Sequence, residues 1–376
     1  MGTTQPKLYA NGGFDVEHKI DPDLFTDSCT ALNEAVDRAV KLSVKWGKPD
    51  KGFIRELKRN NAVFAAFKAH REQNDLAGLL VDDDGNARSF DSFRRAAAPV
   101  IGEYNVSWLQ TEYATAVRVA RTAVRFKQYE KDGDLYPNGE WLPSRAAEPR
   151  MSHRKYYHTV RRLTDPWWET HYPGCVWGCQ CDMRNTDKPV THIGDNPAAP
   201  GAEPTTVPPS EEAGVRSPGL SRNPARSGEL FSRDHPYFTS AYPGAEKAVA
   251  KKMQTIDVKQ ARKEVQEWAK REVVGKSFLN QEIGKEIEVT STGIKEALNQ
   301  PHKYIREKNE AIRNIKQIIH EAHRVLYRPD DKGNQMVVGY HYLEFELAGE
   351  KSYIVIRETK DGRLMFYSVV DKIKGR

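Results

Sequence analysis

Cysteine and histidine residues gather in one short stretch of this 376-residue chain, where three of the four cysteines fall within seven residues. The set comprises His153, His158, His171, Cys175, Cys179 and Cys181. Four ligands that combine imidazole nitrogen and thiolate sulfur are what a structural Zn²⁺ ion takes. A tight turn at Gly178 would bring the thiolates of Cys179 and Cys181 to one ion. The alternative is that reduced cysteines and histidines pack here among Trp167, Trp168 and Trp177.

A second set of polar side chains near the C-terminus has the types that cleave RNA without a metal. Such an enzyme needs an acid and a base near the 2′-hydroxyl and 5′-oxygen, with cations for the phosphorane. His302 and Lys303 beside a helix start, with Tyr367 and Ser368 on a strand, have these types. The alternative is that the tyrosine packs in a sheet and that the other histidines of this region are surface or core residues.

Helices are predicted to carry the first 130 residues. Apolar residues recur at helical spacing over 24–46, and a second helix is expected over 52–71. After a turn at 82–85, periodicity resumes at Ser89, and the run 104–130 contains neither Gly nor Pro, which predicts one long helix. Residues 135–187 are rich in Pro, Trp, Tyr, His and Cys with little periodicity. We therefore expect an irregular segment there, held by aromatic packing or by a metal.

The rest of the chain predicts a linker and a second domain. Residues 188–221 are rich in Pro, Ala, Gly and Ser and read as a linker, followed by a short tail over 223–242. A basic helix over 246–268, a weak extended region over 273–290 and helices over 293–299 and 303–325 follow. Strands are predicted at 336–347, 351–359 and 364–370, joined as hairpins.

The sequence therefore predicts a multi-domain fold. Residues 1–187 form a mainly α-helical domain whose Cys/His-rich irregular segment spans 135–187. Residues 188–245 are linker and tail, and residues 246–376 form a small basic α+β domain in which helices precede an antiparallel sheet.

Composition narrows the function classes. Hydrophobic residues make up 38% and charged residues 29% of the chain, which leaves room for cores and for some length outside them. Residues 246–376 hold 26 of the 58 Lys and Arg and 20 of the 52 Asp and Glu, so the whole formal net charge of +6 falls in this part. No apolar run approaches the roughly 20 residues of a membrane span, and the first residues lack the apolar part of a secretory signal. We expect a protein of the cytoplasm, or of a particle assembled there.

Several spaced motifs between about residues 20 and 240 resemble one family, the Mu-type phage head-morphogenesis (minor head) proteins. Thr111-Glu112-Tyr113 resembles the family's helix core, and Asp165-Pro166-Trp167-Trp168 resembles its Asp-Pro-Phe-Trp. Gly178-Cys179-Gln180-Cys181 is similar to its closing Gly-Cys-x-Cys, and His235-Pro236-Tyr237-Phe238 looks like its tail. One departure is Cys175, which stands near a position where a second Pro is usual.

The resemblance implies a structural Zn²⁺ site and a role in head assembly. It implies His153, Cys179 and Cys181 as metal ligands, with His171 and Cys175 competing for the fourth place. It also implies portal and capsid proteins as partners, and a place in the phage head or in the bacterial cytoplasm during assembly.

The C-terminal layout resembles the barnase/EndoU/colicin/RelE-like nucleases that are appended to some phage head proteins. The stretch 289–295 and the late Phe366-Tyr367-Ser368-Val369 look like members of that group. The resemblance implies a metal-independent ribonuclease with His302 as general base or acid, Lys303 and Lys295 as phosphate-binding cations, and Ser368 as a supporting polar group.

The expected function is thus a minor head protein that carries an RNA-cleaving effector, with RNA as substrate and an immunity protein as a further partner. Two alternatives remain open. The C-terminal domain could be a non-catalytic module that binds nucleic acid or the portal. The chain could also be a bacterial polymorphic toxin with a delivery module derived from a head protein.

Overall fold

The computed structural model describes residues 14–43, 49–191, 216–331 and 333–373. They form two compact units, residues 1–253 and 254–376, and the division falls inside helix α9 (Ala245–Glu272). The N-terminal unit is mainly helical and the C-terminal unit contains a largely antiparallel sheet, which confirms the coarse fold class. The domain limits at 187 and 245 stay predictions.

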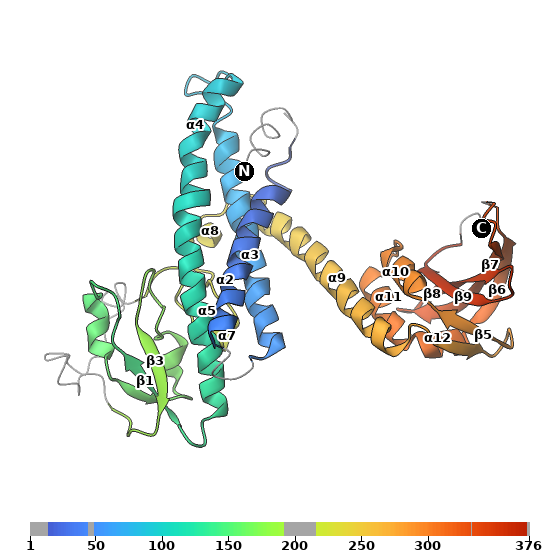
Figure 1. Cartoon of the computed structure of the whole chain (residues 1–376). Helices are drawn as coiled ribbons and strands as arrows, with labels where there is room; N and C mark the ends of the chain where they lie inside the picture. The colour runs from blue at the N-terminus through green and yellow to red at the C-terminus, as the bar shows by residue number, and fades with distance from the viewer. Residues whose placement is uncertain (1–13, 44–48, 192–215, 332, 374–376) are drawn as a thin grey trace. The chain divides into compact units, whose positions relative to one another are not determined.

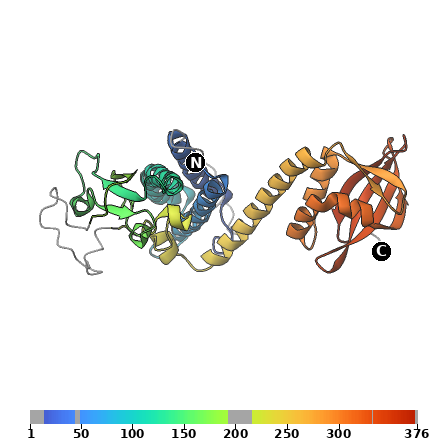
Figure 2. The same ribbon diagram turned by 90° about the horizontal axis from the view of Figure 1, so that it is seen from below.

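Long helices form the core of the N-terminal unit. They are α2 (Pro22–Ser43), α3 (Lys51–Gly78), α4 (Phe90–Gly102) and α5 (Leu109–Lys131). Figures 1 and 2 show α2, α3 and α5 side by side. One face of α2 is buried and carries Leu32, Ala35 and Ala39, as their helical spacing predicts. The Asp50 carboxylate accepts a hydrogen bond from the Phe53 amide at 2.8 Å and begins α3 as its N-cap.

A π-helical stretch, η2 (Glu103–Trp108), joins α4 to α5, where the sequence predicted one uninterrupted α-helix. Its side chains are held by acidic groups on α3. The Tyr104 hydroxyl donates to an Asp75 carboxylate oxygen and the Asn105 amide donates to Glu72, both at 2.5 Å. These contacts join segments that are distant in the sequence, so helical periodicity does not report them.

A charged pair is buried between α3 and α5. The Lys68 ammonium lies 2.6 Å from a carboxylate oxygen of Glu112, and the two side chains are 0% and 4% exposed. The Tyr237 hydroxyl donates to the other oxygen of Glu112 at 2.8 Å. The carboxylate is therefore bonded at both oxygens, as a buried charge requires.

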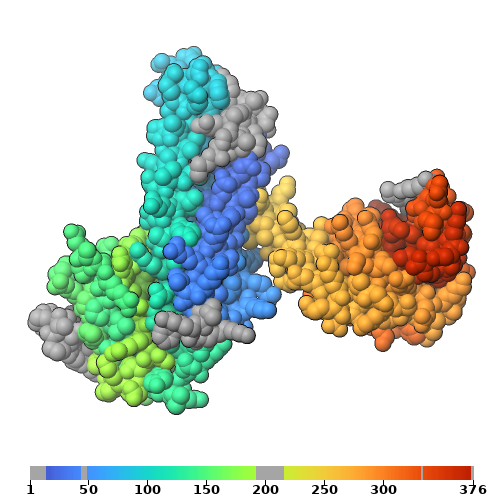
Figure 3. Space-filling view, viewed as in Figure 1, coloured from blue at the N-terminus to red at the C-terminus, as the bar shows by residue number. Residues whose placement is uncertain are grey.

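The segment 135–187 contains more regular structure than its composition predicts. Strands β1 (Asn138–Leu142), β2 (Val160–Arg162) and β3 (Asp182–Thr186) form an antiparallel sheet in the order β2-β1-β3. The strands are too short for a periodic pattern to show, and fully buried Trp141 and Trp168 hold them. In Figure 3 the green surface of this segment is continuous with that of the neighbouring helices.

Residues 216–245 pack into the N-terminal unit. The Phe231 ring stacks on Phe64 with centroids 4.1 Å apart, and the Asn60 side chain bonds both the amide and the carbonyl of Phe231. Short helices α7 (Pro224–Ser227) and α8 (Pro236–Thr239) lie in this stretch. Most of the predicted linker, residues 192–215, lies outside the described residues, whereas Leu220 at its end is fully buried.

The C-terminal unit is a six-stranded sheet covered by helices. Its strands are β4 (Ser277–Asn280), β5 (Lys285–Val289), β6 (His323–Pro329), β7 (Val337–Leu347), β8 (Glu350–Thr359) and β9 (Leu364–Val370). The order is β4-β5-β9-β8-β7-β6, and only the β5–β9 pairing is parallel. Helices α10 (Ser291–Asn299), α11 (Ile305–Ala311) and α12 (Ile315–Glu321) lie with α9 against one sheet face, as the orange and red parts of Figure 2 show.

The predicted helix over 303–325 is divided. A 3₁₀ turn, η5 (Ile312–Asn314), separates α11 from α12, and the chain enters β6 at His323. The buried Lys308 ammonium donates to the carbonyl oxygens of Ala297 and Gln300 at the end of α10, where the negative end of the helix dipole favours a cation. Lys308 is therefore a structural residue.

Candidate metal centre

Three potential metal ligands meet beside the three-stranded sheet. His153 lies in the 3₁₀ turn η3 (Met151–Tyr156), and Cys179 and Cys181 lie in the loop that leads into β3. Gly178 precedes the first cysteine with φ of +75°, a conformation that glycine adopts without strain. The turn places both thiols on the same side of the buried imidazole ring.

The distances among the three ligand atoms suit a tetrahedral ion. His153 Nδ1 lies 3.5 Å from Cys179 Sγ and 3.7 Å from Cys181 Sγ, and all three atoms lie within 4.8 Å of one another. Bonds of about 2.0 Å to nitrogen and about 2.3 Å to sulfur at tetrahedral angles put such atoms roughly 3.5–3.8 Å apart. The cluster could therefore hold a metal ion.

Among the described residues, the two competitors for the fourth place are not part of this cluster of ligand atoms. Cys175 Sγ is 3.9 Å from Nε2, the opposite edge of the His153 imidazole from the other two thiols. The His171 ring stacks on Trp167, and its Nδ1 lies 2.9 Å from the Thr170 hydroxyl. An ion bound at Nδ1 with Cys179 and Cys181 would thus find neither side chain in its own shell.

Hydrogen bonds within the cluster shift the pKa of all three groups. Burial lowers the pKa of His153, but hydrogen bonds to the cysteine sulfurs outweigh it and raise the pKa to about 10. A hydrogen bond from Cys181 lowers the pKa of the Cys179 thiol, and the same bond raises the pKa of Cys181. The Cys179 thiolate thus forms readily, whereas an ion would have to displace the protons of His153 and Cys181, because metals bind thiolate and neutral imidazole.

The cluster opens on one side to a cavity of about 200 Å³. His153 and both ligand cysteines line it, together with Ser144, Ala146, Glu148, Arg150, Gly178 and Gln180. A fourth ligand, whether water or a carboxylate, has room to approach from this side. Sequence reasoning had not singled out Glu148, because a lone acidic residue in a loop carries no pattern.

The C-terminal residues predicted for catalysis are divided between two faces of the sheet. Ser352 lies two and four positions before the core residues Ile354 and Ile356 of β8, so all three side chains point to the sheet face that the helices cover. His302 Nε2 lies 3.2 Å from the Ser352 hydroxyl.

The other predicted residues lie apart from His302. Ser368 pairs with Val355, and the Tyr367 ring lies 4.2 Å below the Arg357 guanidinium, both on the opposite face. Lys295 is exposed on α10. The structure therefore groups only His302 and Lys303 of the five.

Residues that the sequence did not indicate surround His302 and Lys303. The Lys303 ammonium lies 2.5 Å from a Glu350 carboxylate oxygen, which also accepts a bond from the Tyr304 hydroxyl at 2.7 Å. Burial lowers the pKa of His302, so its ring is neutral near pH 7. Glu350 follows a hairpin turn, and nothing in the sequence links it to a histidine almost fifty positions away.

Part of the chain is similar to phage and prophage proteins. The chain is 31% identical over 108 residues, 28% of its length, to the putative capsid assembly protein F of Escherichia phage Mu. It is 29% identical over 104 residues to the Mu-like prophage FluMu F protein of Haemophilus influenzae. Over these stretches the chain is similar to two Mu-type F proteins. The chain spans only about a fifth, 22%, of the length of each of these relatives.

A family model, described as large polyvalent protein-associated domain 3, matches residues 256–367. This range covers most of the C-terminal unit. No solved structure matches the chain significantly. Among the described residues, no helix has the length and apolar character needed to cross a membrane.

Proposed function

We propose that this chain is a minor head protein of a tailed phage or prophage and acts in head assembly at the portal or the inner capsid. The observation that carries the proposal is the similarity to capsid assembly protein F of phage Mu. Its partners are then portal and capsid proteins, and it occupies the virion or, during assembly, the host cytoplasm.

In this proposal the Cys/His cluster holds one structural Zn²⁺ ion. His153 Nδ1, Cys179 and Cys181 bind it, and the fourth ligand enters from the cavity that Glu148 lines. The ion would join η3 to the loop before β3, two segments that short strands alone hold weakly. Cys175 on the other edge of the ring would accept a hydrogen bond from the Nε2–H group and orient the imidazole.

Deletion of the gene from its phage or prophage tests the assembly role. We expect purified heads of the parent to contain the chain by mass spectrometry, and the deletion to reduce the number of DNA-filled heads seen by electron microscopy. Complementation with the intact gene is the control. Normal heads that lack the chain would overturn the proposal and favour the free-toxin alternative.

A second candidate function, RNA cleavage by the C-terminal unit, has one observation in its favour. A neutral His302 adjoins Lys303 at an exposed edge of the unit. The ring would take the 2′-hydroxyl proton as that oxygen attacks phosphorus. The bond to the 5′-oxygen would break as that oxygen takes up a proton from water, while Lys303 faces the phosphate. Glu350 would hold Lys303 in place.

The full chain incubated with mixed RNAs tests this candidate, with His302→Ala and the distant His320→Ala as a matched pair. A nuclease loses cleavage only in the His302 variant, and both variants keep the circular dichroism of the parent. Salt-dependent RNA binding without cleavage would instead make the unit a binding module.

A further inference from the structure

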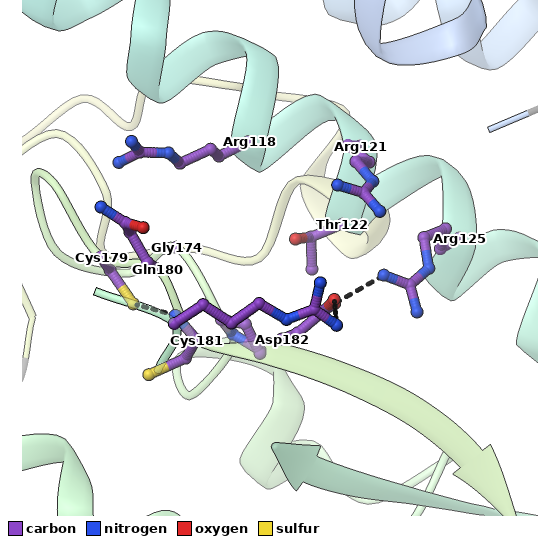
Figure 4. A pocket seen from close by; sticks show the side chains of 11 residues that line it. Arg118, Arg121, Thr122, Arg125, Gly174, Cys179, Gln180, Cys181 and Asp182 are labelled. Atoms are coloured by element: carbon purple, nitrogen blue, oxygen red, sulfur yellow. Dashed lines mark hydrogen bonds and ion pairs between the residues drawn. The ribbon is translucent and has the colours of Figure 1, made fainter. Parts of the chain in front are cut away.

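Arginine side chains surround a second cavity in the N-terminal unit, of about 160 Å³. Arg118, Arg121, Thr122 and Arg125 line one wall and lie on α5, as Figure 4 shows. The opposite wall is the loop that runs from Gly174 through Gln180 to Asp182, with Arg145 beside it.

The helix presents these groups together because of their spacing. Residues 118, 121, 122 and 125 are three, four and seven positions apart, which places them on one face of an α-helix. Thr122 and Arg125 are buried, whereas Arg118 and Arg121 are half-buried at the cavity. Their guanidinium groups therefore project from a rigid element towards one small space.

Positive charge in this cavity is only partly balanced. Asp182 is the one acidic lining residue, and its carboxylate is engaged by Arg125 at 2.5 Å and by Arg145 at 3.8 Å. Within the part of the chain that the structure describes, Arg118 and Arg121 have no acidic partner, and the buried Nε of Arg121 has no hydrogen-bond acceptor. Partial removal of such cations from water without a partner has a cost, so an anion here would be stabilised.

We propose that this cavity binds a phosphate group. Guanidinium forks match the oxygens of phosphate with paired hydrogen bonds, and the Thr122 hydroxyl and the Gln180 amide add neutral donors at the rim. The volume is below the roughly 300 Å³ at which pockets enclose whole small molecules. The site therefore takes one phosphate, either free or borne on a larger molecule such as the backbone of double-stranded DNA.

The inference is independent of the head-assembly proposal and of zinc. A Zn²⁺ ion with two thiolates and a neutral imidazole carries no net charge, so the arginine excess persists when Cys179 and Cys181 are metal-bound.

Calorimetric titration of the full chain with inorganic phosphate tests the site. We expect saturable binding that Arg121→Gln and Arg118→Gln each weaken by about tenfold, the effect of losing one charge-assisted contact. Arg121→Lys retains part of the binding. Arg95→Gln, at an exposed position on α4, is the matched control and binds like the parent. Unchanged melting temperatures show that the variants are folded.

A fluorescent 20-base-pair duplex then identifies the source of the phosphate. If Arg121→Gln weakens binding of both the duplex and inorganic phosphate, the ligand is the DNA backbone. If it weakens only inorganic phosphate, the site takes free phosphate or a small ester. The proposal is overturned if the parent does not bind phosphate, or if both arginine variants bind it as tightly as the parent.

Discussion

Residues chosen for their chemistry behave differently in the two units. In the N-terminal unit, His153, Cys179 and Cys181 come from two separate segments and meet within 4.8 Å. In the C-terminal unit, Tyr367 and Ser368 lie on the opposite face of the sheet from the serine that His302 contacts. Side chains from distant segments meet at one point only when the fold positions them. Polar side chains are spread over both faces of a sheet whenever successive residues of a strand point to opposite sides.

Burial separates the two units in the same way. The ion pair of Lys68 with Glu112 is shielded from water, while that of Lys303 with Glu350 is exposed, at 60% and 49% for the two side chains. The buried pair of the N-terminal unit is therefore expected to matter for folding, and the exposed pair of the C-terminal unit only through binding or catalysis.

Removing the metal ligands should produce the largest effect. We expect Cys179→Ser to reduce zinc, measured by mass spectrometry of metals, from about one ion per chain to near none. Structural zinc contributes about 10–16 kcal/mol in small peptides, so unfolding of this unit should become easier by roughly 5 kcal/mol or more. Cys29→Ser, on α2, should retain the metal. Cys175→Ser should also retain it, and metal loss in that variant would make Cys175 the fourth ligand.

Breaking the buried pair should come next. Lys68→Met leaves the Glu112 carboxylate uncompensated and should lower the free energy of unfolding by about 3–5 kcal/mol in urea titrations. The exposed counterpart, Lys303→Met, should leave the unfolding curve where it was. Equal losses in the two variants would remove the contrast between the units.

Acid should weaken the N-terminal unit through His235. Burial lowers the pKa of His235 from 6.5 to about 4, and its Nδ1 accepts a hydrogen bond from the Tyr237 amide, which requires an unprotonated ring nitrogen. The unfolded chain takes up the proton below about pH 6.5, so stability is lost as pH falls towards 4, by roughly 3 kcal/mol.

Asn at this position keeps an N-cap acceptor that does not titrate. We therefore expect His235→Asn to have a flatter dependence of unfolding free energy on pH between 6.5 and 4 than the parent. Identical slopes for the two proteins would assign the acid sensitivity to other groups.

The smallest effects should come from Tyr367→Phe and Lys295→Gln. The phenylalanine ring keeps its contact with Arg357, and Lys295 is exposed, so both variants should unfold within about 0.5 kcal/mol of the parent. RNA cleavage, where the parent shows it, should also persist. Loss of cleavage in either variant would mean that the substrate reaches groups on both faces of the sheet.

What the sequence could predict follows from the range of the interactions involved. Helix and strand patterns are local, so α2 and the strands β7 to β9 were predicted near their observed bounds. The start of α3 was also predicted, but α3 runs on to Gly78, beyond the predicted end at 71. The pairing of Lys68 with Glu112 joins positions 44 apart, and no local pattern reports it. The division of residues 303–325 was missed because isoleucines on a continuous apolar stripe fit one helix as well as two.

The grouping of His153, Cys179 and Cys181 was predicted from a cluster of rare residue types, but the choice among the candidate ligands was not. A thiol can bind the same ion as His153 Nδ1 only if it faces that edge of the ring. The orientation of the His153 ring depends on its packing against Trp141. The arginine cavity was missed since arginines at helical spacing are ordinary on exposed helices. Only the opposing loop makes them a site.

The π-helical stretch between α4 and α5 acts as a one-residue insertion in an otherwise continuous helix. Each residue of an α-helix turns it by about 100°, so deletion of one residue from 103–108 would restore regular hydrogen bonding yet rotate α4 by that angle about its axis. Buried Phe93 and Ala97 would then point away from the partner that they now cover. The π-helical stretch thus sets the rotation of α4 relative to α5, so that the apolar faces of both helices pack into the same core.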